Sequence, residues 1–147
     1  MNPVSDASSG PIVLQLETLN VVDRGAGVRT TPLVGAWNGS SSLTNGITEF
    51  QPGSAIARHC HNCDESVTLL EGSAICEIEG EEHALKTGDT SFVPAGLTHS
   101  FRNPGPGNLI IHWTYASVSV TRTFAETGET VQHLSASDVS QPNSNSD

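Results

Sequence analysis

The sequence predicts an all-β domain, and three observations carry that prediction. The 147 residues include 14 Gly and 8 Pro, a content typical of chains with many turns. Short apolar or β-branched runs alternate with turn residues along most of the chain, with the short period of β-strands. No helical pattern is long enough to provide the crossovers that a parallel sheet needs. These features favour antiparallel strands in a single sandwich or barrel.

The predicted strand segments are rich in apolar or β-branched residues and are separated by turn residues. In chain order they are residues 12–22, 33–37, 46–50, 59–61, 65–70, 74–78, 83–85, 90–93, 99–103 and 109–124. Turns are expected where Gly, Pro, Asn, Asp or charged residues cluster, at residues 24–27, 38–42, 51–54, 71–72, 79–82, 86–89, 94–96 and 104–108. The segment 109–124 is long enough for one or two strands. After the break at 126–129, residues 130–136 predict a short strand or a turn of helix.

The two ends of the chain differ from the middle in composition. Residues 1–10 are polar and turn-rich, and residues 135–147 consist mostly of Ser, Asn and Asp. Such segments have little apolar surface to bury, so we expect disordered tails. The folded domain is therefore predicted to cover residues 11–134.

The charge of the chain excludes several classes of partner. Six Lys and Arg against sixteen Asp and Glu give a formal net charge of -10, which repels nucleic acids and anionic lipid surfaces. No apolar run approaches the length of a membrane span, and no secretory signal pattern begins the sequence. We expect a soluble, cytoplasmic protein whose partner is a small molecule. Three cysteines are too few for a disulfide framework and fit a reducing compartment.

Three histidines and one glutamate have the spacing of a metal site. His59 and His61 lie two residues apart, which places both imidazoles on one face of a strand. A tight turn at 62–64 returns the chain, so Glu65 opens the next strand toward the same face. His99 begins a later strand just after the turn at 94–96. Three imidazoles and one carboxylate suit Fe(II), Mn(II), Zn(II), Ni(II) or Cu(II).

The spacing of these residues resembles the two sequence motifs of the cupin family. Residues 53–72 read Gly-x5-His-x-His-x3-Glu-x6-Gly, and residues 88–103 read Gly-x5-Pro-x-Gly-x2-His-x3-Asn, with every fixed position matched. The resemblance implies a single cupin-type jelly-roll β-barrel. It also implies one divalent metal ion bound inside by His59, His61, Glu65 and His99. We expect Fe(II) in preference to zinc, manganese or nickel.

Two further residues are candidates for roles beside the metal. His112 lies on a strand expected to border the barrel, and an imidazole facing the cavity would serve as an acid or base. Phe101 shares the parity of His99, so it could form a substrate-binding wall of the pocket. Cys60 lies between the two inward imidazoles and should face the opposite side, which argues against a thiolate ligand.

Three classes of function fit this sequence. A dioxygenase is favoured, because Glu65 is retained and the polar acid or base groups in the predicted cavity are few. A lyase, isomerase or cyclase would use the metal as a Lewis acid and would need a second titratable group, for which His112 is the candidate. A non-catalytic barrel that binds a small molecule is the third reading. The resemblance further implies a homodimer, in which pairing protects the sheet edges.

Overall fold

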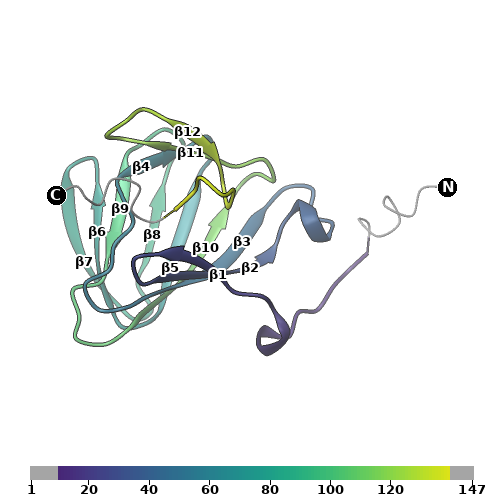
Figure 1. The fold of residues 1–147 in the computed structure, drawn as a ribbon, viewed down its shortest axis with the longest axis horizontal. Coiled ribbons are helices and arrows are strands. Elements are labelled where there is room, and N and C mark those ends of the chain that lie inside the picture. The colour runs from purple at the N-terminus through teal and green to yellow at the C-terminus, as the bar shows by residue number, and fades with distance from the viewer. Residues whose placement is uncertain (1–9, 140–147) are drawn as a thin grey trace.

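The computed structural model describes residues 10–139 and consists of two facing antiparallel sheets of six strands each (Figure 1). The first sheet contains, in spatial order, β1 (Val22–Gly25), β2 (Val28–Val34), β3 (Thr44–Phe50), β10 (Leu109–Tyr115), β5 (Glu65–Glu71) and β8 (Thr90–Val93). The second contains β12 (Thr130–Gln132), β11 (Thr121–Phe124), β4 (His59–His61), β9 (His99–Arg102), β6 (Ser73–Ile78) and β7 (Glu81–Lys86). The prediction of an all-β fold is confirmed.

The expected closed barrel differs from the architecture of the described chain. Each sheet ends in edge strands, β1 and β8 in the first and β12 and β7 in the second, so hydrogen-bonded pairing does not run around a full circle. The arrangement is consistent with a jelly-roll sandwich. The only helical elements among residues 10–139 are the short 3-10 turns η1 (Leu16–Thr18) and η2 (Ala36–Asn38). No helix in this part of the chain is long and apolar enough to span a membrane.

The core lies between the two sheets and follows the strand period of two. Along β3 and β10 every second residue is buried, starting with the first residue of each strand. Side chains from both sheets form one cluster, with Phe50, Leu69 and Leu109 from the first sheet and Cys76 and Phe101 from the second. Alternation of this kind places residues i and i+2 on the same face, so the inward residues of each strand can be read from its burial pattern.

Three segments differ from the sequence-based expectation. Residues 12–21 form no strand; they contain η1 and lie outside the two sheets (Figure 1), and Val13 is 86% exposed. The prediction missed residues 28–32 of β2, whose polar and proline residues hide the strand pattern. The predicted strand 33–37 is split between two elements: residues 33 and 34 end β2, whereas residues 36 and 37 belong to η2.

The long segment 109–124 divides into two strands that belong to different sheets. β10 pairs with β3 and β5 in the first sheet, whereas β11 pairs with β4 and β12 in the second. The chain therefore crosses from one sheet to the other between 115 and 121. Tyr115 and Arg122 consequently approach the interior from opposite sheets.

The last described residues are packed against the sandwich. Asp138 is 2% exposed and forms ion pairs with Arg24 and Arg122. Packing thus continues beyond residue 134, where the sequence suggests that the domain ends, because two buried arginines hold this carboxylate. The rest of the predicted tails, residues 1–9 and 140–147, lies outside the described residues.

Candidate metal centre

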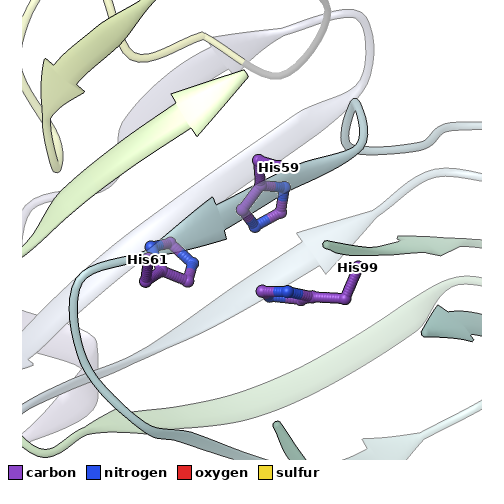
Figure 2. Close-up of side chains that lie close together, drawn as sticks. All are labelled: His59, His61 and His99. Atoms are coloured by element: carbon purple, nitrogen blue, oxygen red, sulfur yellow. The ribbon is translucent and has the colours of Figure 1, made fainter. Parts of the chain in front are cut away.

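Three of the predicted ligands meet between the sheets, on the inner face of the second sheet. His59 and His61 project from the same face of β4, and His99 projects from the neighbouring strand β9 (Figure 2). His59 and His99 are direct partners in the register of the two strands. The potential ligand atoms of the three side chains all lie within 4.8 Å of one another, and each residue is at most 4% exposed.

Backbone carbonyls fix the orientation of all three imidazoles. In each ring Nδ1 donates to a carbonyl oxygen. Nδ1 of His59 donates to Ala57 at 2.6 Å. Nδ1 of His61 donates to Thr121 at 3.0 Å, and Nδ1 of His99 donates to Leu97 at 3.0 Å. A carbonyl can only accept, so the Nδ1 position carries the proton and Nε2 keeps a lone pair. Metal-binding histidines are held in this way, with one ring nitrogen bonded to the protein and the other free for the ion.

Glu65 reaches the histidines from the opposite sheet. Its Oε1 lies 2.8 Å from Nε2 of His99 and 3.8 Å from Nε2 of His61, and the residue is 7% exposed. The position at the start of β5, directly after the predicted turn, aims the carboxylate inward as the sequence suggests. The structure therefore brings His59, His61, Glu65 and His99 together at one place.

The surroundings of His59, His61 and Glu65 favour two neutral imidazoles and an ionised carboxylate. Burial lowers the pKa of His59 well below its ordinary value and that of His61 to about 4. Burial by itself would raise the pKa of Glu65, but the hydrogen bond to His99 and the nearby positive charges hold it below its ordinary value. Neutral imidazole and ionised carboxylate are the forms that bind a metal ion.

These residues fit a divalent ion. The Nε2 atom of His61 is buried and has no hydrogen-bond partner within residues 10–139, so its lone pair is unused. The Nε2 atom of His99 and the Oε1 atom of Glu65 face each other as two acceptors, a contact that needs a cation or an extra proton between them. An ion that takes up these lone pairs satisfies both features, and the N3O donor set suits the transition metals considered above.

The wall of the cavity next to the ligands contains residues that the sequence analysis did not assign. Phe101 lines the cavity as predicted, and its role in substrate binding stays a prediction. The unassigned lining residues with polar groups come from both sheets and from the segment after β12. They are Arg24, Thr48, Trp113, Tyr115, Arg122 and His133.

Tyr115 and His133 supply the phenol and the unassigned imidazole of this wall. The ring centroid of Tyr115 lies 4.6 Å from that of His61, and Tyr115 is the register partner of Glu65. His133 contacts the Tyr115 ring edge-on, with centroids 4.9 Å apart. Burial lowers the pKa of His133 well below its ordinary value and raises that of Tyr115 well above its own.

The assignment of His112 to the cavity is wrong. Along β10 the inward positions are Leu109, Ile111, Trp113 and Tyr115, so His112 projects from the outer face of the first sheet. Its register partners are Ile47 and Thr68. A signal was present in the sequence, because the odd-numbered positions carry the bulky apolar and aromatic side chains that a core selects.

The cysteines occupy the positions that strand parity suggests. All three are free thiols, and Cys60 alternates with the two inward histidines of β4. Cys76 is fully buried in the core, as a small apolar residue would be. Burial raises the pKa of Cys63 and of Cys76 to about 11, which disfavours the thiolate form of both.

Comparison with known families identifies the fold and its sequence motifs. The family model described as the cupin domain matches residues 46–115, a range that contains all four predicted ligands. The chain belongs to the cupin superfamily. The two motifs at 53–72 and 88–103 are therefore those of a cupin, on a sandwich that keeps the histidines and Glu65 between its sheets.

Relatives of this cupin include proteins named as enzymes. Dimethylsulfoniopropionate lyase DddW from Ruegeria pomeroyi is 35% identical over 74 residues, which cover 50% of this chain and 48% of the lyase. The match with the lyase thus spans about half of the length of the lyase. The match with the tetracenomycin polyketide synthase protein TcmJ from Streptomyces glaucescens covers 46% of TcmJ.

Solved structures share the fold at lower identity. The sugar phosphate isomerase of the cupin superfamily from Silicibacter pomeroyi superposes with a TM-score of 0.69 and 21% identity, covering 82% of this chain and 86% of that one. Salicylate 1,2-dioxygenase from Pseudoaminobacter salicylatoxidans superposes with a TM-score of 0.58 and 16% identity, covering 64% of this chain and 26% of the dioxygenase. At these identities the likeness concerns the fold alone.

Proposed function

We propose that this cupin is a mononuclear metal-dependent enzyme whose reaction moves a proton on a small oxygenated substrate, as in a lyase, an isomerase or a cyclase. The metal ligands in this proposal are the three histidines of β4 and β9 together with Glu65. The ion, when bound, polarises a carbonyl or hydroxyl oxygen of the substrate as a Lewis acid. The protein must then supply the group that carries the proton.

The position of Tyr115 is the observation that carries this proposal. Its ring lies beside that of His61 and its backbone is paired with that of Glu65, so the phenol shares the cavity with the metal ligands. A phenolic hydroxyl can donate and accept a hydrogen bond and is a known acid or base in enzymes. We assign proton transfer to Tyr115, with His133 packed edge-on against its ring.

We favour a proton-transfer reaction over the dioxygenase that the sequence favours. The preference for a dioxygenase depends on a cavity with few acid or base groups, whereas Tyr115 and His133 both line it. The relative with the highest identity quoted above is named as a lyase, and the dioxygenase resembles this chain only in fold. Both points support Lewis-acid chemistry with proton transfer.

A dioxygenase is the second candidate. Three histidines and one carboxylate leave up to two positions of an octahedral ion open, enough for a chelating substrate and a further ligand. Iron in the purified protein and consumption of oxygen with a chelating substrate would favour this reading.

The first experiment measures metal content and proton transfer in the same preparations. The protein is purified without chelators or a metal-affinity tag, and its metals are quantified beside those of the His59→Ala variant. Deuterium exchange at the carbon next to the carbonyl is then followed by NMR for pyruvate and hydroxyacetone in D2O. We expect near-stoichiometric metal that is lost in His59→Ala, and exchange that requires this metal.

A pair of variants tests the assignment of Tyr115. Tyr115→Phe removes only the hydroxyl, so metal content should stay the same while exchange falls about 100-fold or more. His112→Gln on the outer face of the same strand is the matched control and should exchange at the wild-type rate. Unchanged exchange in Tyr115→Phe, or oxygen uptake with no metal-dependent exchange, would overturn the proposal.

A further inference from the structure

Two buried arginines beside the metal centre share one carboxylate. Arg24 in β1 is 3% exposed and Arg122 in β11 is 2% exposed. Both approach the same oxygen of Asp138, with Nη2 of Arg24 at 3.1 Å and Nε of Arg122 at 2.8 Å from Oδ1. Oδ1 of Asp138 thus lies within ion-pair distance of both guanidinium groups. A buried charge without full compensation is unfavourable unless another group pairs with it.

The hydrogen bonds of the two arginines are unequal. Arg24 donates to the carbonyl oxygen of Asp138 at 3.0 Å, to its Oδ1 at 3.1 Å and to Oγ1 of Thr30 at 3.0 Å. For Arg122, the Nε–H does not point at Oδ1 despite the short distance, and Nη1 has no hydrogen-bond partner within residues 10–139. A guanidinium always carries its charge and its N–H donors, so these buried donors are unsatisfied.

The unsatisfied donors lie at the metal centre. Arg122 is the register partner of His61 across β11 and β4, and it lines the same cavity as His59, His99 and Tyr115. With a divalent ion in place, the ion outweighs the carboxylate of Glu65 by one positive charge, next to the unsatisfied donors of Arg122. A neutral substrate would leave this excess in place, whereas an anionic substrate would reduce it.

We propose that Arg122 binds a carboxylate group of the substrate, so that the substrate class is a small oxo or hydroxy carboxylate. This identity of the substrate rests on the proposed function, while the carboxylate site rests on Arg122 alone. The guanidinium fork matches a planar carboxylate through two parallel hydrogen bonds. The second oxygen function of such a substrate then faces the three histidines.

The substrate carboxylate takes the place that Asp138 now holds beside Arg122. The cavity has a volume of only about 20 Å³, about the room of one water molecule, so a larger ligand enters when a side chain moves aside. Asp138 has the charge and the geometry of the incoming group and belongs to the segment after β12 rather than to a strand. Exchange of one carboxylate for another keeps both arginines paired.

Tryptophan fluorescence gives a direct measure of carboxylate binding. The chain has two tryptophans, and only Trp113 lines the cavity, whereas Trp37 is 55% exposed. In a Trp37→Phe background, the emission of Trp113 is titrated with pyruvate and with hydroxyacetone, which lacks the carboxylate. The titration is carried out on metal-loaded protein and on metal-free protein.

Three variants separate the role of Arg122 from a general effect of charge. Arg122→Gln should weaken pyruvate binding by at least about tenfold and leave hydroxyacetone unchanged, because only the carboxylate uses the guanidinium. Asp138→Asn removes the competing carboxylate, so pyruvate should bind several-fold more tightly and raise the melting temperature more than in the wild type. Arg102→Gln, whose exposed guanidinium pairs with Glu82, is the matched control and should bind as the wild type.

The outcomes distinguish this inference from the proposed function. Pyruvate binding that depends on Arg122, without any proton exchange, supports the carboxylate site and contradicts the function. Equal affinity for pyruvate and hydroxyacetone, no pyruvate binding at millimolar concentration, or wild-type binding in a folded Arg122→Gln variant overturns the inference. If Arg122→Gln does not fold, Asp138→Asn decides, and unchanged or weaker binding in that variant also overturns it.

Discussion

The Nε2 atom of His99 and the Oε1 atom of Glu65 lie 2.8 Å apart and join the two sheets at the centre of the sandwich. His99 already donates from Nδ1 to the carbonyl oxygen of Leu97. The contact with Glu65 therefore needs either a second proton or a cation in its place. This pair links metal binding to the way in which the two sheets are held together.

Glu65 is predicted to be a metal ligand and not only a hydrogen-bond partner of His99. Glu65→Gln keeps the size of the side chain and one acceptor oxygen but removes its charge, so the affinity for a divalent ion should fall about tenfold or more. Competition with a chromophoric chelator measures that affinity. Glu71→Gln at the exposed end of the same strand is the control. Wild-type affinity in Glu65→Gln would remove Glu65 from the ligand set.

The metal-free protein should lose stability in mild acid. The pKa of His61 is lowered by burial to about 4, while in the unfolded chain this imidazole takes up a proton near its ordinary value of 6.5. Between these values the unfolded state binds more protons, so stability is complete above about pH 6.5 and falls as the pH decreases toward 4. The protonation of His61 in the unfolded chain should by itself lower the free energy of unfolding by about 2 kcal/mol when the pH falls from 7.5 to 5.

Urea unfolding at the two pH values measures this effect. His61→Asn should show a pH dependence that is smaller by about the same 2 kcal/mol, and His83→Asn, on the exposed face of β7, should behave as the wild type. The buried His59 and His133 also have lowered pKa values and should leave part of the acid sensitivity in His61→Asn. Equal stability of the metal-free wild type at both pH values would contradict the prediction.

The sequence predicts the ligands far better than the rest of the cavity, for a physical reason. His59, His61 and Glu65 are joined by a short strand and a tight turn, so local geometry alone brings them to one face. The face of β10 that is buried depends on the neighbouring sheet. Strand parity places His112 and Tyr115 on opposite faces, and the bulky side chains at positions 109, 111, 113 and 115 favour the face of Tyr115 as the buried one.

Arg122 is harder still to predict, since charged residues are seldom fully buried. It alternates with Val120 and Phe124 on the inner face, where the strand pattern alone suggests an apolar side chain. Its partner Asp138 lies in a segment whose composition resembles a tail, so neither half of the pair is visible without the fold. The expected barrel also depends on pairing between edge strands, which no local pattern specifies.

Phe101 should shape the substrate side of the cavity without affecting the metal. The ring is 5% exposed and lies on the same face of β9 as His99. Phe101→Leu keeps most of the apolar volume, so the free energy of unfolding should fall by only about 1 kcal/mol and the metal content should not change. Pyruvate affinity in the fluorescence titration should fall several-fold. Affinity equal to that of the wild type would show that Phe101 belongs to the core alone.

We propose that the chain forms a homodimer through the segment before β1 and the outer face of the first sheet. Val13 is 86% exposed and Leu16 is 57% exposed, and Leu16 borders a groove of about 320 Å³ that also contains Ile47, Leu70 and Ile110. Apolar side chains of this size gathered at one surface are typical of an interface. In a two-fold symmetric dimer, the segment before β1 of each copy would cover the groove of the other copy.

Sedimentation velocity measures the association directly. The wild-type protein should sediment as a dimer at micromolar concentration, and Leu16→Glu should shift it toward the monomer because a charge replaces the buried apolar contact. Gln15→Glu adds the same charge at an exposed polar position of the same segment and should leave the dimer intact. The metal content should be the same in all three proteins, since the ligands lie within one sandwich. A wild-type monomer at all concentrations, or a dimer that Leu16→Glu leaves unchanged, would rule out this interface.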